Sequence, residues 1–64
     1  MNLMQQYFEL NVLAMQTMKE IAILTAKNQN APSYLRDQYL QAVDDMNFVA
    51  IQIDAELSKN EQHT

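Results

Sequence analysis

The chain contains no glycine and a single proline, and this constrains its fold more than any other feature. Glycine and proline are the residues that most often end helices and form turns, so a chain without them has few places to reverse direction. The one interruption of the helical pattern is the stretch Asn28-Gln29-Asn30-Ala31-Pro32-Ser33. We therefore predict an all-α fold in which two helices of similar length form an antiparallel hairpin.

The predicted boundaries follow from this interruption. The first helix should cover about residues 2–27, the turn residues 28–32 and the second helix about residues 33–59. Together they form one domain over residues 1–59. The last five residues, 60–64, contain no apolar side chain, and we expect this tail to fray.

The length of 64 residues makes association with another chain the expected source of stability. For a domain of this size, the gain from apolar burial and the entropic cost of ordering are each about 100 kcal/mol and nearly cancel. The chain has no cysteine and one histidine, so neither a disulfide nor a zinc centre built on thiolates or several histidines is available as a staple. We expect two hairpins to dimerise into a four-helix bundle.

The second helix carries a regular apolar seam that should face the first helix. Its members follow alternating steps of four and three residues, which is the spacing of one helix face. They are Leu35, Tyr39, Ala42, Met46, Val49 and Ile53, with Val43, Ala50 and Leu57 widening the same stripe.

The first helix carries two neighbouring seams, whereas a hairpin supplies only one helix to pack against. The first seam consists of Leu3, Tyr7, Leu10, Ala14, Thr17, Ile21 and Leu24. The second seam consists of Met4, Phe8, Asn11, Met15, Met18 and Ala22. We predict that a second copy of the chain packs against the second seam, which is then the dimer interface. In the alternative, a different protein packs against this seam.

Two features of the second seam leave alternatives open. Asn11 either forms a symmetric amide pair that fixes the register of the dimer, or lies at the edge of the bundle and reaches water. The methionines Met1, Met4, Met15 and Met18 either form an adaptable binding surface, or belong to the core like most apolar side chains of a helix stripe.

The outer side of the second helix carries apolar side chains that a fully solvated face would not need. Leu40, Phe48 and Ile51 lie there, close to the carboxylates Asp37, Asp44 and Asp45. An apolar anchor surrounded by charge is typical of a protein-binding surface. We predict a partner-binding site at Leu40, Asp44, Phe48 and Ile51. The alternative is that the three apolar side chains complete the core of the bundle.

The residues that could perform chemistry are few and badly spaced, and we expect no enzymatic activity, no cofactor and no metal. The adjacent pair Asp44-Asp45 diverges by about 100° on a helix, so the two carboxylates cannot share a proton. No glutamate has a histidine three residues later, as di-iron bundles require. His63 lies in the predicted tail, where no other group positions it.

The charge of the chain disfavours two classes of partner. With four basic and eight acidic residues, the formal net charge is -4, which disfavours both nucleic acid and anionic membrane surfaces.

The longest apolar runs are far shorter than a bilayer requires, and no basic residue precedes Lys19, so we expect neither a membrane span nor a signal peptide. The absence of cysteine is compatible with a cytoplasmic location.

The predicted architecture resembles that of the Rop-like RNA-binding regulators of plasmid copy number, which are hairpins that dimerise into four-helix bundles. RNA recognition of that kind relies on a basic helix face, whereas Lys19, Lys27, Arg36 and Lys59 are dispersed in this sequence. Residues 20–57, a turn followed by a Tyr-containing amphipathic helix, are similar in pattern to the helical-hairpin co-chaperones of type III secretion needle subunits.

Three functions follow, in order of expectation. The first is a small inhibitor or adaptor that occupies the surface of a target protein, as free-standing acidic hairpins of phages and mobile elements do. The second is a structural or chaperone subunit completed by another chain, as the resemblance to the secretion co-chaperones implies. The third is a Rop-like regulator, which the charge of the chain disfavours.

Overall fold

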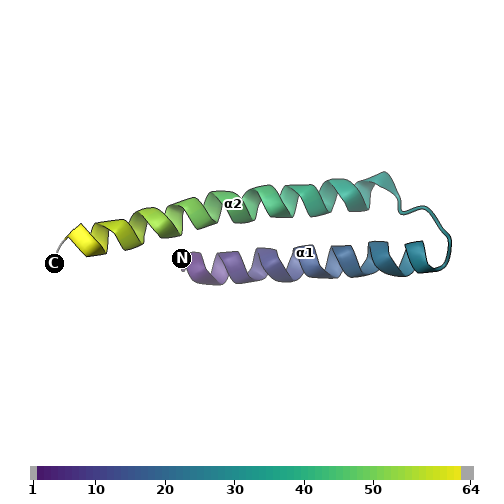
Figure 1. Cartoon of the computed structure of the whole chain (residues 1–64), viewed down its shortest axis with the longest axis horizontal. Helices are drawn as coiled ribbons and strands as arrows, with labels where there is room; N and C mark the ends of the chain where they lie inside the picture. Colours follow the sequence, from purple (N-terminus) through teal and green to yellow (C-terminus); the bar gives the residue numbers. More distant parts are fainter. Residues whose placement is uncertain (1, 63–64) are drawn as a thin grey trace.

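The computed structural model describes residues 2–62, and the side chains of residues 2–59. Two helices, α1 (Leu3–Ala26) and α2 (Ser33–Gln62), pack side by side as an antiparallel hairpin (Figure 1). No strand is present among the residues that the structure describes, and the hairpin measures 55 × 18 × 14 Å. The predicted all-α hairpin is therefore confirmed.

The ends of α1 are held by hydrogen bonds that its sequence supplies. Asn2 is the N-cap, and its side-chain oxygen accepts a hydrogen bond of 2.9 Å from the backbone N–H of Met4. At the other end, the N–H of Gln29 donates to the carbonyl of Leu24 at 2.9 Å, and the N–H of Asn28 donates to the carbonyl of Thr25 at 3.0 Å. This pair of bonds is the Schellman motif, which satisfies carbonyls that the helix itself leaves free.

Asn28 takes the position in this motif that glycine usually occupies. Its φ angle is 59°, in the left-handed region that asparagine tolerates better than most other residues with a side chain. A chain without glycine can therefore still end α1 sharply. The turn observed between the two helices covers residues 27–32, close to the predicted 28–32.

Helix α2 is the longer of the two, with 30 residues against 24 in α1. It begins at Ser33, directly after Pro32, whose carbonyl accepts a hydrogen bond of 3.1 Å from the N–H of Leu35. It continues to Gln62, three residues beyond the predicted end, and its C-terminal part extends past the start of α1 (Figure 1). The remainder of the predicted tail, with His63, lies outside the described residues.

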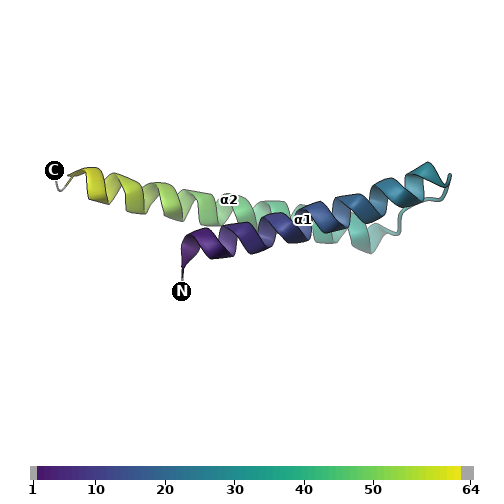
Figure 2. The ribbon, with the colours of Figure 1, turned by 90° about the horizontal axis from the view of Figure 1, so that it is seen from below.

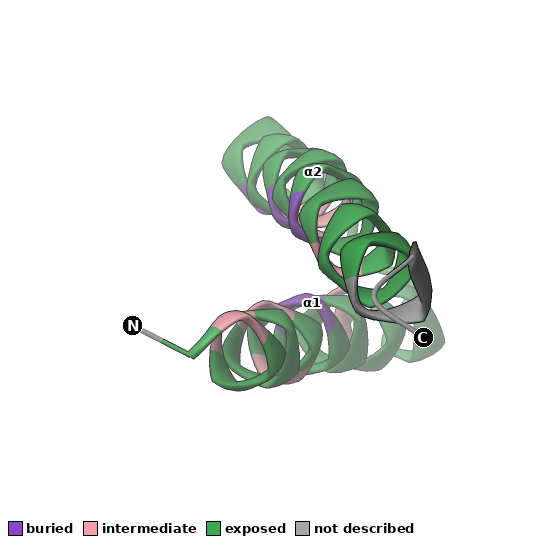
Figure 3. Ribbon diagram, turned by 90° about the vertical axis from the view of Figure 1, so that its left-hand side faces the viewer, coloured by how far each residue is buried: buried purple, intermediate pink, exposed green. Residues whose placement is uncertain are grey.

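The core of the hairpin is a narrow strip of buried residues, most of which have small side chains. In Figure 3 the buried segments of the two ribbons face each other. Ala14 and Thr17 of α1 are buried, as are Leu35, Ala42 and Val49 of α2. Small residues at the contact allow the two helix axes to approach closely. The other members of the predicted α2 seam, Tyr39, Met46 and Ile53, are half-buried.

The first seam of α1 packs against α2 with one difference from the prediction. Leu3, Leu10, Ile21 and Leu24 are half-buried, but Tyr7 is exposed and Gln6 is half-buried in its place. The two helices cross in Figure 2, so the contacting stripe shifts around α1 towards its N-terminal end. Ala50 and Leu57, which the sequence pattern placed at the margin of the α2 seam, are exposed as well.

Candidate interaction surfaces

A polar bridge connects the two helices within the buried strip. Thr17 is 1 % exposed, and its hydroxyl donates to the carbonyl of Leu13 at 2.8 Å. The same hydroxyl accepts a hydrogen bond of 2.7 Å from the side-chain amide of Gln38 in α2. Hydrogen bonding thus satisfies the one buried polar residue in the described part of the chain.

The sequence pattern did not identify Gln38. The signal was the polar Thr17 inside an otherwise apolar seam, because a buried hydroxyl needs a hydrogen-bond partner. The second helix contains four glutamines, and the register of the two helices places Gln38 next to Thr17.

Replacing Gln38 by alanine should lower the free energy of unfolding by about 0.5 to 1.5 kcal/mol, the net worth of one hydrogen bond. The Thr17 hydroxyl would keep its bond to Leu13 but lose its donor from α2. Urea denaturation would measure the change. Gln41→Ala is the matched control, because Gln41 donates to Asp45 one turn away on the same exposed face of α2. An equal loss in both variants would show that the bridge between the helices contributes nothing.

The second seam of α1 makes no part of the hairpin core. All six members, Met4, Phe8, Asn11, Met15, Met18 and Ala22, are exposed. Within a single hairpin the methionines Met4, Met15 and Met18 are therefore surface residues, and Met1 lies outside the described residues. This seam remains without a packing partner in the described part of the chain.

The second seam borders a groove that we name the Met groove. It is lined by Asn11, Ala14, Met15, Met18, Lys19, Ala22, Tyr39 and Met46. Both helices contribute to it, so the apolar surface of α1 continues across the contact onto α2. Asn11 lies within this apolar surface, and its side chain makes no hydrogen bond with another described residue.

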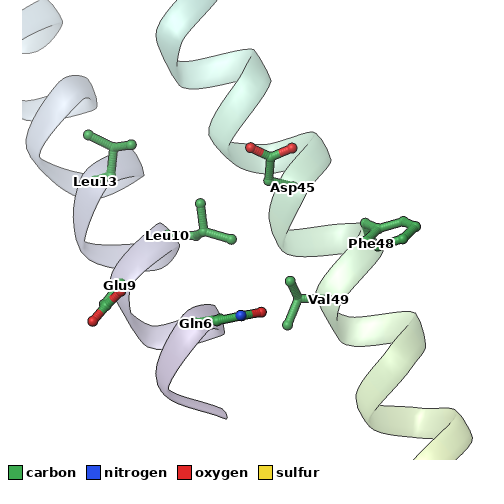
Figure 4. A pocket seen from close by; sticks show the side chains of 7 residues that line it. All are labelled: Gln6, Glu9, Leu10, Leu13, Asp45, Phe48 and Val49. Carbon is green, nitrogen blue, oxygen red and sulfur yellow. The ribbon is translucent and has the colours of Figure 1, made fainter. Parts of the chain in front are cut away.

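A second groove runs along the opposite side of the contact between the helices. It is lined by Gln6, Glu9, Leu10, Leu13, Asp45, Phe48 and Val49 (Figure 4). Leu10 and Val49 point into the space between the helices, whereas Phe48 points away from α1 (Figure 4). This groove is more polar at its rim than the Met groove, because Glu9 and Asp45 both line it.

The predicted partner-binding residues lie on the outer side of α2. Leu40, Asp44, Phe48 and Ile51 are all exposed, and none belongs to the core of the hairpin. At about 100° per residue, the four residues fall on one stripe that is directed away from α1. Phe48 is 64 % exposed, the same fraction as Phe8 on the second seam of α1.

The charged side chains of residues 2–59 form an ion pair but no metal site. Among residues 2–59, no cluster of three His, Asp or Glu side chains is arranged to hold a metal ion. The ion pair between Lys59 and Glu56, 3.9 Å long, is exposed and one helical turn in span. In the part of the chain that the structure describes, no helix is both long and apolar enough to span a bilayer.

No known protein family, curated protein or solved structure matches the chain.

Proposed function

We propose that the chain is a small non-enzymatic interaction protein that dimerises into a four-helix bundle and occupies the surface of a target protein as an inhibitor or adaptor. One observation carries the proposal: large apolar side chains are exposed in two separate stripes, the second seam of α1 and the outer stripe of α2. Contiguous exposed apolar surface of this kind is typical of protein interfaces.

The dimer accounts for the second seam of α1. Each hairpin buries one face of α1 against α2 and leaves the adjacent face in water. When two hairpins pack face to face, the second seam of each copy is buried. Each helix then has two neighbours, as in other four-helix bundles. The same seam would serve a second candidate function, a structural or chaperone subunit whose missing helices come from a different chain.

The target-binding surface is the outer stripe of α2, formed by Leu40, Asp44, Phe48 and Ile51. The apolar side chains of such a stripe supply most of the binding energy when a partner groove desolvates them. The neighbouring carboxylates steer the encounter and favour a target with a basic rim. With a net charge of -4, the chain should bind a protein rather than nucleic acid. A cytoplasmic location and a phage or mobile-element origin complete the proposal.

Replacing Phe48 by aspartate tests the target-binding surface. Because Phe48 is exposed, the variant should keep its helicity and its dimer, while its affinity for the target falls at least a hundredfold, as loss of a central anchor predicts. The target is first identified by affinity capture. Its binding to the original chain and to the Phe48→Asp variant is then measured with purified components by calorimetry.

The control is Glu56→Gln, an exposed change on α2 outside the stripe. A Phe48→Asp variant that binds the purified target as tightly as the original chain would remove Phe48 from the site. A variant whose dimer melts would place Phe48 in the core of the bundle instead.

A further inference from the structure

We propose that the two copies pack through one defined face with their turns at opposite ends of the bundle, and that Arg36 and Asp54 form reciprocal ion pairs across it. This inference rests on the proposed dimer and specifies its arrangement. We call the surface the dimer face. On α1 it consists of the second seam, and on α2 of a parallel seam with the same alternating steps, Arg36, Leu40, Val43, Asn47, Ala50 and Asp54.

The structure places these two seams on the same side of the hairpin. The Met groove joins four members of the α1 seam to Tyr39 and Met46, and Val43 and Ala50 lie one turn further along α2 from those two residues. At the turn, Arg36 lines a hollow together with Ile21 and Thr25 of α1. The dimer face is therefore one surface made by both helices.

The exposed area of the hairpin is sufficient for such a partner. The accessible surface is 5266 Å². A compact monomer of this mass would expose about 4,200 Å², so the hairpin exposes about 1,000 Å² more. A stable interface of standard size buries about 800 Å² on each partner. A second copy on the dimer face would cover an area of this size.

The charges on the dimer face distinguish between the two ways of placing the second copy. Arg36 lies near the turn and Asp54 near the open end, about 27 Å apart along α2. Neither takes part in an ion pair among the described residues. With both turns at the same end, Arg36 would lie at the same level of the bundle as the partner's Arg36, and Asp54 at the same level as the partner's Asp54. With the turns at opposite ends, Arg36 meets Asp54 of the partner subunit, and Asp54 meets the partner's Arg36.

The registers of the two helices agree on one symmetry axis for the second arrangement. The α2 seam runs from Arg36 to Asp54 and is centred on residue 45, while the α1 seam runs from Met4 to Ala22 and is centred on residue 13. Leu13 and Asp45 line the same groove, so these two centres lie at the same level of the hairpin (Figure 4). A single two-fold axis therefore relates α1 to its copy and α2 to its copy in register.

The arrangement also assigns Asn11 and Leu40. The two copies of Asn11 would lie about 6 Å apart along the bundle, on either side of the axis, where their amides can pair. Leu40 belongs to both the outer stripe and the dimer face, and in this arrangement the second copy would cover it and remove it from the target-binding surface. Asp44, Phe48 and Ile51 would then remain on the outer side of α2 for the target.

Distances between the two turns test the arrangement directly. The chain has no cysteine, so Gln29→Cys provides one spin-labelling site per copy in the turn. Turns at opposite ends should place the two labels about 40 Å apart or more, as the 1.5 Å rise per residue dictates. Turns at the same end should place them within about 25 Å, the width of the bundle. Sedimentation equilibrium of the same labelled chain would establish the dimer.

Charge reversal provides the second measurement. Arg36→Asp alone should raise the dissociation constant of the dimer about tenfold at low salt, because it brings like charges together at both ends of the α2 contact. The double variant Arg36→Asp/Asp54→Arg should return it to within about threefold of the original value. Absence of any dimer would overturn the proposed function itself. A dimer with short label distances, or without rescue in the double variant, would overturn only the arrangement.

Discussion

Replacing Phe8 by alanine should raise the dissociation constant of the proposed dimer about a thousandfold. Phe8 is the largest side chain of the second seam of α1, and 64 % of it is exposed in the single hairpin. In the proposed dimer the second copy would bury it. Truncation of a central aromatic anchor costs about 2 kcal/mol or more, and a symmetric dimer loses it twice. About 4 kcal/mol corresponds to a factor of about 10³. Sedimentation equilibrium over a range of concentrations would measure the change.

Phe48→Ala is the matched control for this variant. It removes the same side chain with the same exposure, but from the outer side of α2, so the dissociation constant of the dimer should stay within about twofold. If the two substitutions weaken the dimer equally, or if Phe8→Ala leaves it unchanged, the second seam of α1 is not the interface between copies.

Replacing Leu35 by alanine should lower the free energy of unfolding by about 2 to 5 kcal/mol. Leu35 is 4 % exposed and lies in the first turn of α2, where it lines a hollow together with Leu24 and Pro32. The substitution removes volume from the buried strip, and closely packed surroundings close such a cavity only in part. Because many small domains have a total free energy of unfolding of only about 5 to 15 kcal/mol, this loss would be a large fraction of the total. Chemical denaturation at fixed protein concentration would measure the loss.

Leu13→Ala is the comparison for Leu35→Ala. Leu13 belongs to α1, is 39 % exposed, and lies on neither the dimer face nor the outer stripe of α2. Its removal should cost about 1 kcal/mol, since much of the side chain is already in contact with water. Similar losses in the two variants would mean that the buried strip between the helices does not determine the stability of the hairpin.

The helices and their contact could be predicted from the sequence because their signals are periodic. The lack of glycine left the stretch before Pro32 as the only place for a turn, and the seam from Leu35 to Ile53 has the spacing of one helix face. The first seam of α1 could be predicted less well near Tyr7. The two helices cross, and this crossing shifts the contact around α1 by an amount that the spacing of apolar residues does not predict.

The candidate sites were predictable as stripes of residues but not as surfaces. The spacing of Met4, Phe8 and Met15 identifies a helix face, yet their exposure depends on the single hairpin having no third helix to cover them. The common level of Leu13 and Asp45, which sets the axis of the proposed dimer, follows from the register across the turn. Register between helices is a tertiary property, and Gln38 was missed for the same reason.

The turn before α2 also limits how copies of the chain can exchange parts. Domain swapping through one continuous helix would require residues 27–32 to become helical, so that α1 and α2 join end to end in each copy. In that helix the ring of Pro32 would clash with the carbonyl of Asn28, four residues earlier, at a cost of about 3 kcal/mol or more. Asn28 in its left-handed conformation already ends α1 with two hydrogen bonds. Copies of this chain should therefore assemble as closed hairpins, and runaway assembly through exchanged helices should be rare even at high concentration.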